Sequence, residues 1–375
     1  GDYLRILHII NNLGSGGAEK LIESITPIMN QYQYIDVEVL ILDDKNNVFD
    51  NKLLENEIKL SVVPIRKMRN PMNIFYIRNF ILKGEFDIVH AHLFPTNYWT
   101  SFVSKTIFKN KPKFITTEHN THNKRRDKWY FRSIEKYIYN NYDKIISISQ
   151  ETQDNLITWL KINNDINNKF TVIENGIDLK KFTKAIPYKK KEINKIFNED
   201  TILLCMVGRF NEQKDQSTII KTIKELPNNI HLLLIGEGEL KKYNENLADV
   251  LGVSDRVHFL GFRNDIDRIL KSVDIVILSS KWEGFGLAAV EGMAAGKPVI
   301  VTKVPGLSRI VNGAGLTFEV GNIKELKEKI LILLNEEVYK EISDKCLLRS
   351  KKYSIEKMVE KYLEEYKKLR ADIDG

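Results

Sequence analysis

One stretch of the chain, residues 273–298, constrains the fold most, because it encodes a strand, a glycine turn and a helix in direct succession. Residues 273–278, VDIVIL, have the length and composition of a buried strand. Gly284 and Gly286 then supply a tight turn, and residues 287–295, LAAVEGMAA, are rich in helix-forming residues until the sequence GKP ends the helix. This order of elements is typical of a parallel α/β sheet.

The turn before that helix is a candidate anion-binding site, because free N–H groups and the helix dipole favour a phosphate there. Glu283 precedes the turn, and Glu291 lies about 7 Å beyond Gly286 at about 1.5 Å per helical residue. Burying an acid is costly unless something hydrogen-bonds to it, so a ligand with hydroxyls on both sides of a diphosphate would satisfy both acids. A nucleotide sugar has this layout. In the alternative interpretation, Glu283 only starts the helix and Glu291 pairs with a lysine such as Lys297.

The sequence EGFGLAAVEGMAAGKPVI resembles the E-x7-E region of GT-B glycosyltransferases of the retaining family 4 type. The resemblance implies that Glu283 contacts hydroxyls of the donor sugar and that Glu291 contacts the ribose. It also implies that three backbone N–H groups face donor oxygens, those of Phe285, Gly286 and Leu287.

A second strand-to-helix turn carries two cations. Residues 201–207 predict a strand, and Arg209 and Lys214 flank the turn that follows it. Two cations in this position can neutralise a leaving diphosphate, and VGRF-x-x-x-K resembles the pyrophosphate-binding pair of the same family. An exposed Arg/Lys pair is the alternative. By the same resemblance Arg263, which follows a predicted strand over 256–260, is the candidate contact for the nucleobase.

The segment Asp265-Ile266-Asp267 matches the D-x-D pattern of metal-dependent GT-A transferases. It stands where a helix should start, which favours an N-cap role for Asp265. We therefore expect no metal ion and no separate cofactor, with the nucleotide-diphosphate sugar acting as co-substrate.

The first half also begins with a strand and a glycine-rich turn. Gly14 and Gly16 fit the dinucleotide fingerprint G-x-G-x-x-G, but Glu19 occupies its third glycine position, so NAD binding is an alternative with a damaged motif. The sequence GSGGAE resembles the first loop of the glycosyltransferase family, where Gly16 and Gly17 would let the backbone approach the donor phosphate and the acceptor. An ordinary left-handed turn is the other interpretation.

Histidines collect near the ends of predicted strands in this half: His90, His92, His119 and His122. Zinc is an alternative that no cysteine and no H-E-x-x-H arrangement supports. Ligand groups gather beyond the carboxyl ends of strands in open α/β sheets, and His119 has such a position. It also matches the family histidine that reaches the transferred sugar, whereas a hydrogen-bonded loop histidine is the alternative.

Positive charge is concentrated in one segment of a chain whose formal net charge is +7. Eight bases stand against Glu118 and Asp127, which leaves +6: Lys105, Lys109, Lys111, Lys113, Lys124, Arg125, Arg126 and Lys128. Such a cluster suits an anionic membrane surface or a polyphosphate-bearing acceptor, unless it is simply a solvated surface. No nucleic-acid-binding module accompanies it, so we expect no nucleic acid partner.

The alternation of strands and helices restarts in the middle of the chain, after the sequence VIENGID. We expect a GT-B fold, with two Rossmann-like α/β domains whose parallel sheets face each other across a cleft. The acceptor-binding domain is predicted over 1–178, a lysine-rich linker over 179–195 and the nucleotide-sugar-binding domain over 196–353. An amphipathic helix over 354–375 is expected to return to the first domain.

The sequence therefore predicts a retaining, metal-independent glycosyltransferase with Glu283, His119, Arg209 and Lys214 as catalytic residues. A UDP- or GDP-sugar is the expected donor and a lipid-linked glycan of the capsule or O-antigen type the expected acceptor. Two widely separated cysteines and no apolar run near 18 residues lead us to expect a cytoplasmic protein, peripheral on the inner membrane face. The alternatives are a GT-B epimerase or phosphorylase, and a nucleotide-sugar-binding protein without turnover.

Overall fold

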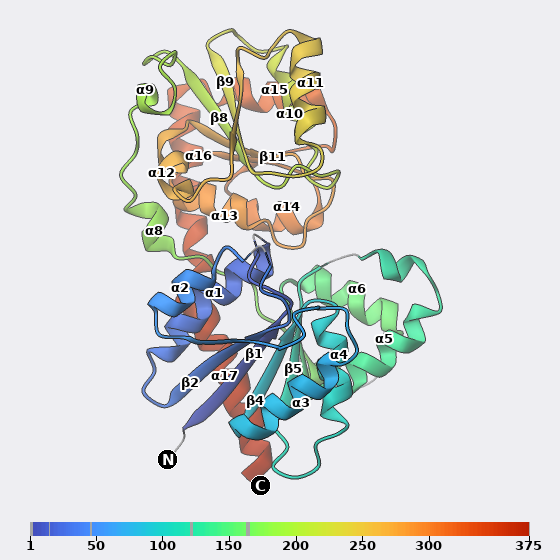
Figure 1. Cartoon of the computed structure of the whole chain (residues 1–375). Coiled ribbons are helices and arrows are strands. Elements are labelled where there is room, and N and C mark those ends of the chain that lie inside the picture. The colour runs from blue at the N-terminus through green and yellow to red at the C-terminus, as the bar shows by residue number, and fades with distance from the viewer. Residues whose placement is uncertain (1–2, 15, 46, 121–122, 163–165, 375) are drawn as a thin grey trace. The chain divides into compact units, whose positions relative to one another are not determined.

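The computed structural model describes residues 3–374 apart from 15, 46, 121–122 and 163–165 (Figure 1). The chain divides into two compact units, the first made of Gly1–Gly176 with Ile355–Gly375 and the second of Ile177–Ser354. Both units have the parallel α/β architecture that the sequence predicts.

Over the described residues, the sheet of the first unit has seven parallel strands in the order β3-β2-β1-β4-β5-β6-β7. Their bounds are β1 (Leu4–Ile10), β2 (Ile35–Ile41), β3 (Lys59–Val62), β4 (Ile88–His92), β5 (Lys113–Glu118), β6 (Lys144–Ser147) and β7 (Phe170–Val172). The chain runs outward from β1 to β3 and then returns to pair β4 with β1. This reversal of direction creates a switch point between β1 and β4, where ligands bind in open α/β sheets.

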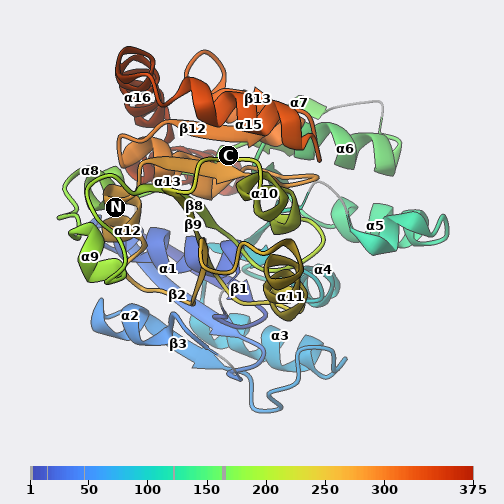
Figure 2. The same cartoon turned by 90° about the horizontal axis from the view of Figure 1, so that it is seen from above.

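Helices cover both faces of this sheet, because alternate strand residues point to opposite sides. On one face Ile6 and Ile10 pack against α1 (Gly17–Asn30) and α17 (Ile355–Asp374). On the other face Leu7 packs in a core with the remaining long helices. Figure 2 shows α1 and α3 on opposite sides of the strands. The other helices are α2 (Asp50–Glu55), α3 (Asn73–Gly84), α4 (Thr96–Ser104), η1 (Lys124–Asp127), α5 (Phe131–Asn140), α6 (Gln150–Leu160) and α7 (Ile166–Lys169).

The second unit has six parallel strands over its described residues, in the order β10-β9-β8-β11-β12-β13. Their bounds are β8 (Ile202–Val207), β9 (Ile230–Ile235), β10 (Val257–Gly261), β11 (Ile275–Leu278), β12 (Val299–Thr302) and β13 (Leu316–Phe318). Here the chain reverses between β10 and β11, which places the switch point between β8 and β11. The loops that follow these two strands are the ones in which the sequence places Lys214 and Glu283.

The helices of the second unit include two within the segment expected to be a linker, α8 (Leu179–Thr183) and α9 (Lys190–Ile193). That segment is held by the second unit, since the backbone N–H of Tyr188 donates to Ser272 Oγ over 2.7 Å. The other helices are α10 (Gln216–Ile223), α11 (Lys241–Leu251), α12 (Ile266–Ser272), α13 (Leu287–Ala294), α14 (Pro305–Val311), α15 (Ile323–Ile332), α16 (Glu336–Ser350) and η2 (Lys351–Tyr353).

Cys205 and Cys346 are both buried and unbridged. Within the described part of the chain, no helix combines the length and the apolar character needed to cross a membrane.

Candidate active site

The loops after β8 and β11 are joined to each other by hydrogen bonds. The backbone N–H of Lys281 donates to the carbonyl oxygen of Gln213 over 2.8 Å, and Gln213 Nε2 donates to the carbonyl oxygen of Trp282 over 3.0 Å. The buried hydroxyl of Ser279 donates to the carbonyl oxygen of Lys214 over 3.0 Å. The two loops therefore form one braced surface at the switch point.

Lys214 and Glu283 form an ion pair on this surface, between Nζ and Oε2. Ser280 Oγ donates to the same carboxylate oxygen over 3.3 Å. The side chains of Lys214 and Glu283 are only 20% and 12% exposed, so water screens this pair less than a surface ion pair. An ammonium group has three donors, and Glu283 is the only partner of Nζ among the described residues. Two donors remain for an anionic ligand.

Helix α13 starts beside this pair, at a glycine that the packing requires. Gly286 has a φ of 68°, and a Cβ added to it would lie 2.3 Å from Leu307 Cδ2. The side chain of Phe285 is buried and packs edge-on against Tyr353, with 5.5 Å between the ring centres. Phe285 can therefore offer a ligand only its backbone. Among the described residues no side chain caps α13, so the N–H groups at its start, beginning at Leu287, have the free position that an anion cradle needs.

Glu291 lies one turn further along α13 and is 3% exposed. Arg209 is on the β8 loop with Lys214, but its side chain is 72% exposed and pairs with Glu239 at 3.6 Å. An exposed pair of this kind contributes little stability, so Arg209 can leave Glu239 for a ligand at low cost. The structure thus brings Lys214 and Glu283 together and leaves Arg209 turned toward another loop.

Arg263 lies apart from the other candidates of this unit, after the edge strand β10, which β9 separates from β8. Its guanidinium donates twice to Asp265, over 2.8 and 2.6 Å, and Tyr188 donates to the same carboxylate over 2.7 Å. The bonds from Arg263 hold the pKa of Asp265 at about 2. Asp265 occupies the N-cap position of α12 as expected, but among the described residues its side chain makes no cap hydrogen bond to a backbone N–H of the helix. The carboxylate is used for Arg263 and Tyr188 instead.

In the first unit, the carboxyl group of Glu19 fills the space beside Gly16, in the turn before α1. A Cβ added to Gly16 would lie 2.2 Å from Glu19 Oε2, and burial raises the pKa of Glu19. Gly17, in contrast, has no described atom within 4 Å of an added Cβ. A carboxyl group at Gly16 stands where a dinucleotide would need its pyrophosphate, which weighs against the NAD alternative.

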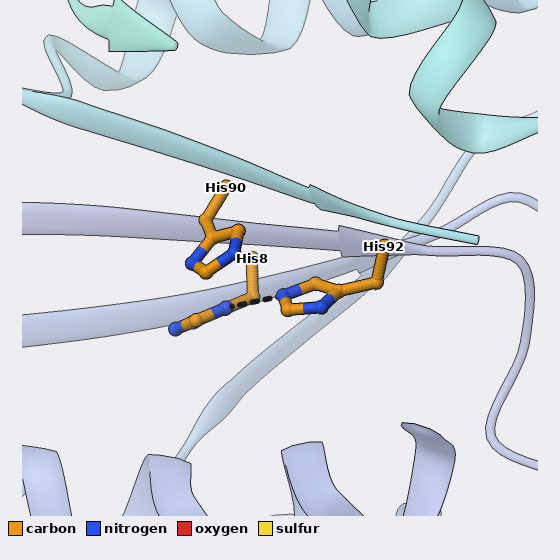
Figure 3. Close-up of side chains that lie close together, drawn as sticks. All are labelled: His8, His90 and His92. Carbon is orange, nitrogen blue, oxygen red and sulfur yellow. Dashed lines mark hydrogen bonds between the residues drawn. The ribbon is translucent and has the colours of Figure 1, made fainter. Parts of the chain in front are cut away.

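His119 follows β5 and is joined to a row of buried histidines. Its Nε2 lies 3.1 Å from His92 Nδ1, and His92 Nε2 lies 3.0 Å from His8 Nδ1 (Figure 3). His90 stacks on His92 but bonds elsewhere, to Tyr366 and to Thr117 at 2.6 and 2.7 Å. Burial lowers the pKa of His8 to about 3 and that of His119 to about 4, and it lowers the pKa values of His90 and His92 well below the ordinary value.

Three of these histidines, His8, His90 and His92, have ring nitrogens within 4.8 Å of one another, as a metal site requires. Among their ring nitrogens only His8 Nε2 lacks a hydrogen-bond partner in the described part of the chain. A metal ion would therefore have to replace existing hydrogen bonds. Of the histidines that the sequence suggested for zinc, His122 lies outside the described residues. His8 was not among them.

The basic segment does not form one patch. Strand β5 separates the lysines before it from those after it by about 17 Å, at about 3.3 Å per residue. Arg126 is internal: it pairs with Glu118 at 2.9 Å and with Glu135 at 3.4 Å. Arg125 also pairs with Glu135, at 3.3 Å. The eight bases therefore do not act as one surface of charge +6, because tertiary pairing neutralises two of them and a strand divides the rest.

Two family profiles match consecutive parts of the chain. The profile described as glycosyl transferases group 1 matches residues 188–370, and the one described as glycosyltransferase family 4 matches residues 15–181. An uncharacterized glycosyltransferase of Methanocaldococcus jannaschii is 31% identical over 347 residues, covering 88% of this chain and 90% of that protein. The UDP-Gal:alpha-D-GlcNAc-diphosphoundecaprenol alpha-1,3-galactosyltransferase of Escherichia coli is 27% identical, covering 81% and 79%.

Solved structures share the fold over almost the whole chain. Anabaena HepE in complex with UDP and glucose has a TM-score of 0.82 at 20% identity, covering 96% of this chain and 98% of that one. A glycosyltransferase from Rickettsia africae has a TM-score of 0.82 at 22% identity, covering 98% and 99%. These likenesses agree with the GT-B architecture read from the two sheets.

Proposed function

We propose, because this chain belongs to the group 1 glycosyltransferases, that it moves a sugar from a nucleoside diphosphate to an acceptor with retention of configuration and without a bound metal ion. The observation that carries the proposal is the Lys214–Glu283 pair beside the start of α13, at the switch point between β8 and β11. It combines a cation and uncapped helix N–H groups for a diphosphate with a carboxylate for sugar hydroxyls.

The roles follow from where charge develops. Breaking the bond between sugar and phosphate leaves negative charge on the diphosphate and positive character on the sugar. Lys214, the N–H groups at the start of α13, and Arg209 after it leaves Glu239 stabilise the diphosphate. Glu283, held by Lys214 and Ser280, is oriented to accept hydrogen bonds from sugar hydroxyls. The Glu283 carboxylate is engaged in this way. We therefore propose that the acceptor attacks the sugar on the face that the phosphate leaves, with assistance from that phosphate.

The remaining candidates contribute binding in this proposal. Glu291 accepts from the ribose and Arg263 lies toward the nucleobase. The backbone of the turn before α13 approaches the donor at Phe285, Gly286 and Leu287. In the first glycine loop Gly17 has room for such an approach, whereas Gly16 has it only after the Glu19 carboxyl group moves away. In the first unit, His119 donates a hydrogen bond to the transferred sugar during turnover.

Two relatives support the choice of substrates. The name of the Escherichia coli relative specifies a UDP-sugar donor and a diphosphoundecaprenol-linked acceptor, and another relative is an O-antigen biosynthesis glycosyltransferase. We propose a UDP-sugar donor, with a GDP-sugar as the second choice. The acceptor we propose is a lipid-linked glycan in assembly of a capsule or O-antigen type of polysaccharide.

A thermal-shift series with UDP-, GDP-, ADP- and dTDP-sugars tests the donor. We expect one nucleotide class to raise the Tm, by linkage to the folded state, and free nucleotide to be released only when acceptor is present. Lys214→Ala should reduce the shift for the same donor, whereas Lys281→Ala, an exposed lysine on the neighbouring loop, should keep it in full. Nucleotide release without acceptor, or binding without any transfer, would favour the epimerase and binding-protein alternatives.

Part of the first unit also fits a membrane surface. Tyr130, the N-cap of α5, recurs at helical spacing with Ile134 and Tyr137 of the helix, and the three side chains are 47%, 43% and 51% exposed. Trp129, just before the helix, is 80% exposed, and Lys128 and Lys136 are exposed beside these side chains. Aromatic rings suit the headgroup region and lysines suit anionic lipid. We propose that this face, defined here as the α5 face, holds the protein peripherally on the cytoplasmic leaflet, where a lipid-linked acceptor would be presented.

The double variant Trp129→Ala/Tyr137→Ala should bind vesicles containing anionic phosphatidylglycerol at least about tenfold more weakly than wild type at low salt, because it removes two interfacial rings. Co-sedimentation with such vesicles measures this, with neutral vesicles as the baseline. The matched control is Phe108→Ala, which removes an 87% exposed ring at the other end of β5. Equal loss in the control, or no anionic-lipid binding by wild type, would contradict the α5 face.

A further inference from the structure

We propose that His92 and His8 are positioning residues that fix the tautomer of His119, so that its proton sits on Nδ1 and points away from the row. The inference concerns how the histidine is prepared, and its catalytic consequence rests on the proposed function. No chemistry passes through His8 or His92.

The geometry comes from neighbouring strands. β1, β4 and β5 lie side by side in the sheet, and His8 on β1 is opposite His90 on β4 in the register. His92 is two residues further along β4, on the same face, and reaches both His8 Nδ1 and His119 Nε2. His8 and His92 are fully buried, whereas His119 is partly exposed at the end of the row. Figure 3 shows the bond between His8 and His92.

A row of three neutral imidazoles has only two consistent arrangements of protons, since each ring carries one N–H. Burial lowers the pKa values of all three, which keeps them neutral near pH 7. In one arrangement the donors point from His8 toward His119; in the other they point from His119 toward His8. Both make the same two hydrogen bonds. The difference lies at the two ends.

The buried end of the row decides between them. His8 Nε2 is buried and has no hydrogen-bond partner among the described residues. If the donors pointed toward His8, this nitrogen would carry a buried N–H without an acceptor among the described residues. Among backbone groups, buried donors without a partner are rarer than under-satisfied acceptors, and we apply the same preference to this ring. We therefore assign the proton of His8 to Nδ1 and that of His92 to Nδ1. His119 then accepts at Nε2 and keeps its proton on Nδ1, where no described residue bonds to it.

His90 stabilises the row without belonging to it. Its ring centre lies 4.2 Å from that of His92, which holds the plane of the His92 ring. Both of its own nitrogens are taken by Tyr366 and Thr117, so it passes no preference to His119. His90 is therefore a matched control, because it is equally buried in the same cluster but its hydrogen bonds do not lead to His119.

Nitrogen-15 NMR of the full-length protein, labelled only at its seven histidines, tests the assignment without substrate. His119 is identified by the signal lost in His119→Gln. We expect a pyridine-type Nε2 and a pyrrole-type Nδ1 in wild type. His8→Leu, which removes the first donor, should give His119 a mixture of tautomers, whereas His8→Asn, whose amide nitrogen can replace Nδ1, should preserve the wild-type signal. His90→Gln should also leave it unchanged.

Kinetics provides the second measurement. We expect His8→Leu to lower kcat about tenfold with KM nearly unchanged, since a misplaced group at a reacting centre affects the chemical step. His8→Asn should restore most of kcat. If His8→Leu does not fold, His92→Leu against His92→Asn makes the same comparison. A pyrrole-type Nε2 in wild-type His119, or an unchanged His119 signal in His8→Leu, overturns the inference, even in an active transferase. The expected NMR pattern in a protein without transfer activity would instead refute the proposed function.

Discussion

Replacing Lys214 by alanine should lower kcat for sugar transfer about a hundredfold to a thousandfold, the range seen when one preorganised donor to a developing anion is removed. The ammonium group is held in place by Glu283, and in the proposed function its two remaining donors bind the leaving diphosphate, whose charge grows in the transition state. KM should change less than kcat. Steady-state kinetics with the donor found by thermal shift measures both.

Glu283→Ala should cause a loss of similar size, and the double variant should lose less than the two single losses combined, because the two residues act as one pair. Lys214→Met separates charge from packing, since the side-chain stem of Lys214 lies along Gly208. Lys281→Ala is the control for charge alone: its partner Glu212 is 3.7 Å away and 77% exposed, and kcat should stay within about twofold. Wild-type turnover by Lys214→Ala would refute the role of the pair.

The second large effect is on stability in mild acid. In the unfolded chain, imidazoles bind protons with a pKa near 6.5, whereas in the folded first unit burial lowers the pKa of His8 to about 3. His90 and His92 are lowered in the same direction. Below pH 6.5 the unfolded chain therefore holds more protons, and the free energy of unfolding falls as the pH falls. Burial also lowers the pKa of His119, to about 4. At pH 5.5 each of these four histidines should therefore cost about 1.4 kcal/mol, or about 5.5 kcal/mol together.

Urea unfolding at pH 7.5 and pH 5.5 measures this loss. Trp282→Phe leaves the three tryptophans of the first unit as its fluorescent reporters: Trp99, Trp129 and Trp159. This choice matters because burial also lowers the pKa values of His231 and His258 in the second unit. Adding His90→Gln should make the loss between the two pH values smaller by about 1.4 kcal/mol, whatever its effect at pH 7.5. An identical loss with and without His90 would show that the buried histidines are not responsible.

The sequence predicts the strands and turns of the candidate site better than it predicts which of them lie side by side. Glycine turns and short apolar runs locate the strands, and this places Lys214 and Glu283 after β8 and β11. Their pairing depends on strand order, since β11 lies beside β8 although β9 and β10 come between them in the chain. The resemblance of the motifs to one family supplied that information. Local periodicity does not reveal which strands are adjacent.

Other features depend on contacts that no local pattern reveals. His8 looks like any polar residue in a strand, and only its register with His90 and its bond to His92 show it to be part of a row. The one available signal is the alternation of side chains along a strand, which places His8, His90 and His92 on one sheet face if β1 and β4 are adjacent. The basic segment failed as a prediction for a similar reason. Arg126 is paired with Glu135, a residue outside that segment.

The two ends of the chain share one core. Side chains of α17, among them Met358, Tyr362 and Tyr366, are buried with α1 and β1, which were synthesised more than 300 residues earlier. A ribosome must therefore deliver the whole second unit before the first can be completed. Until then this apolar sheet face of the nascent amino-terminal part is covered by α1 but not by α17 and can attract chaperones, whereas Ile177–Ser354 already has all its strands. Removing α17 alone would leave the part of this sheet face that α17 covers permanently exposed.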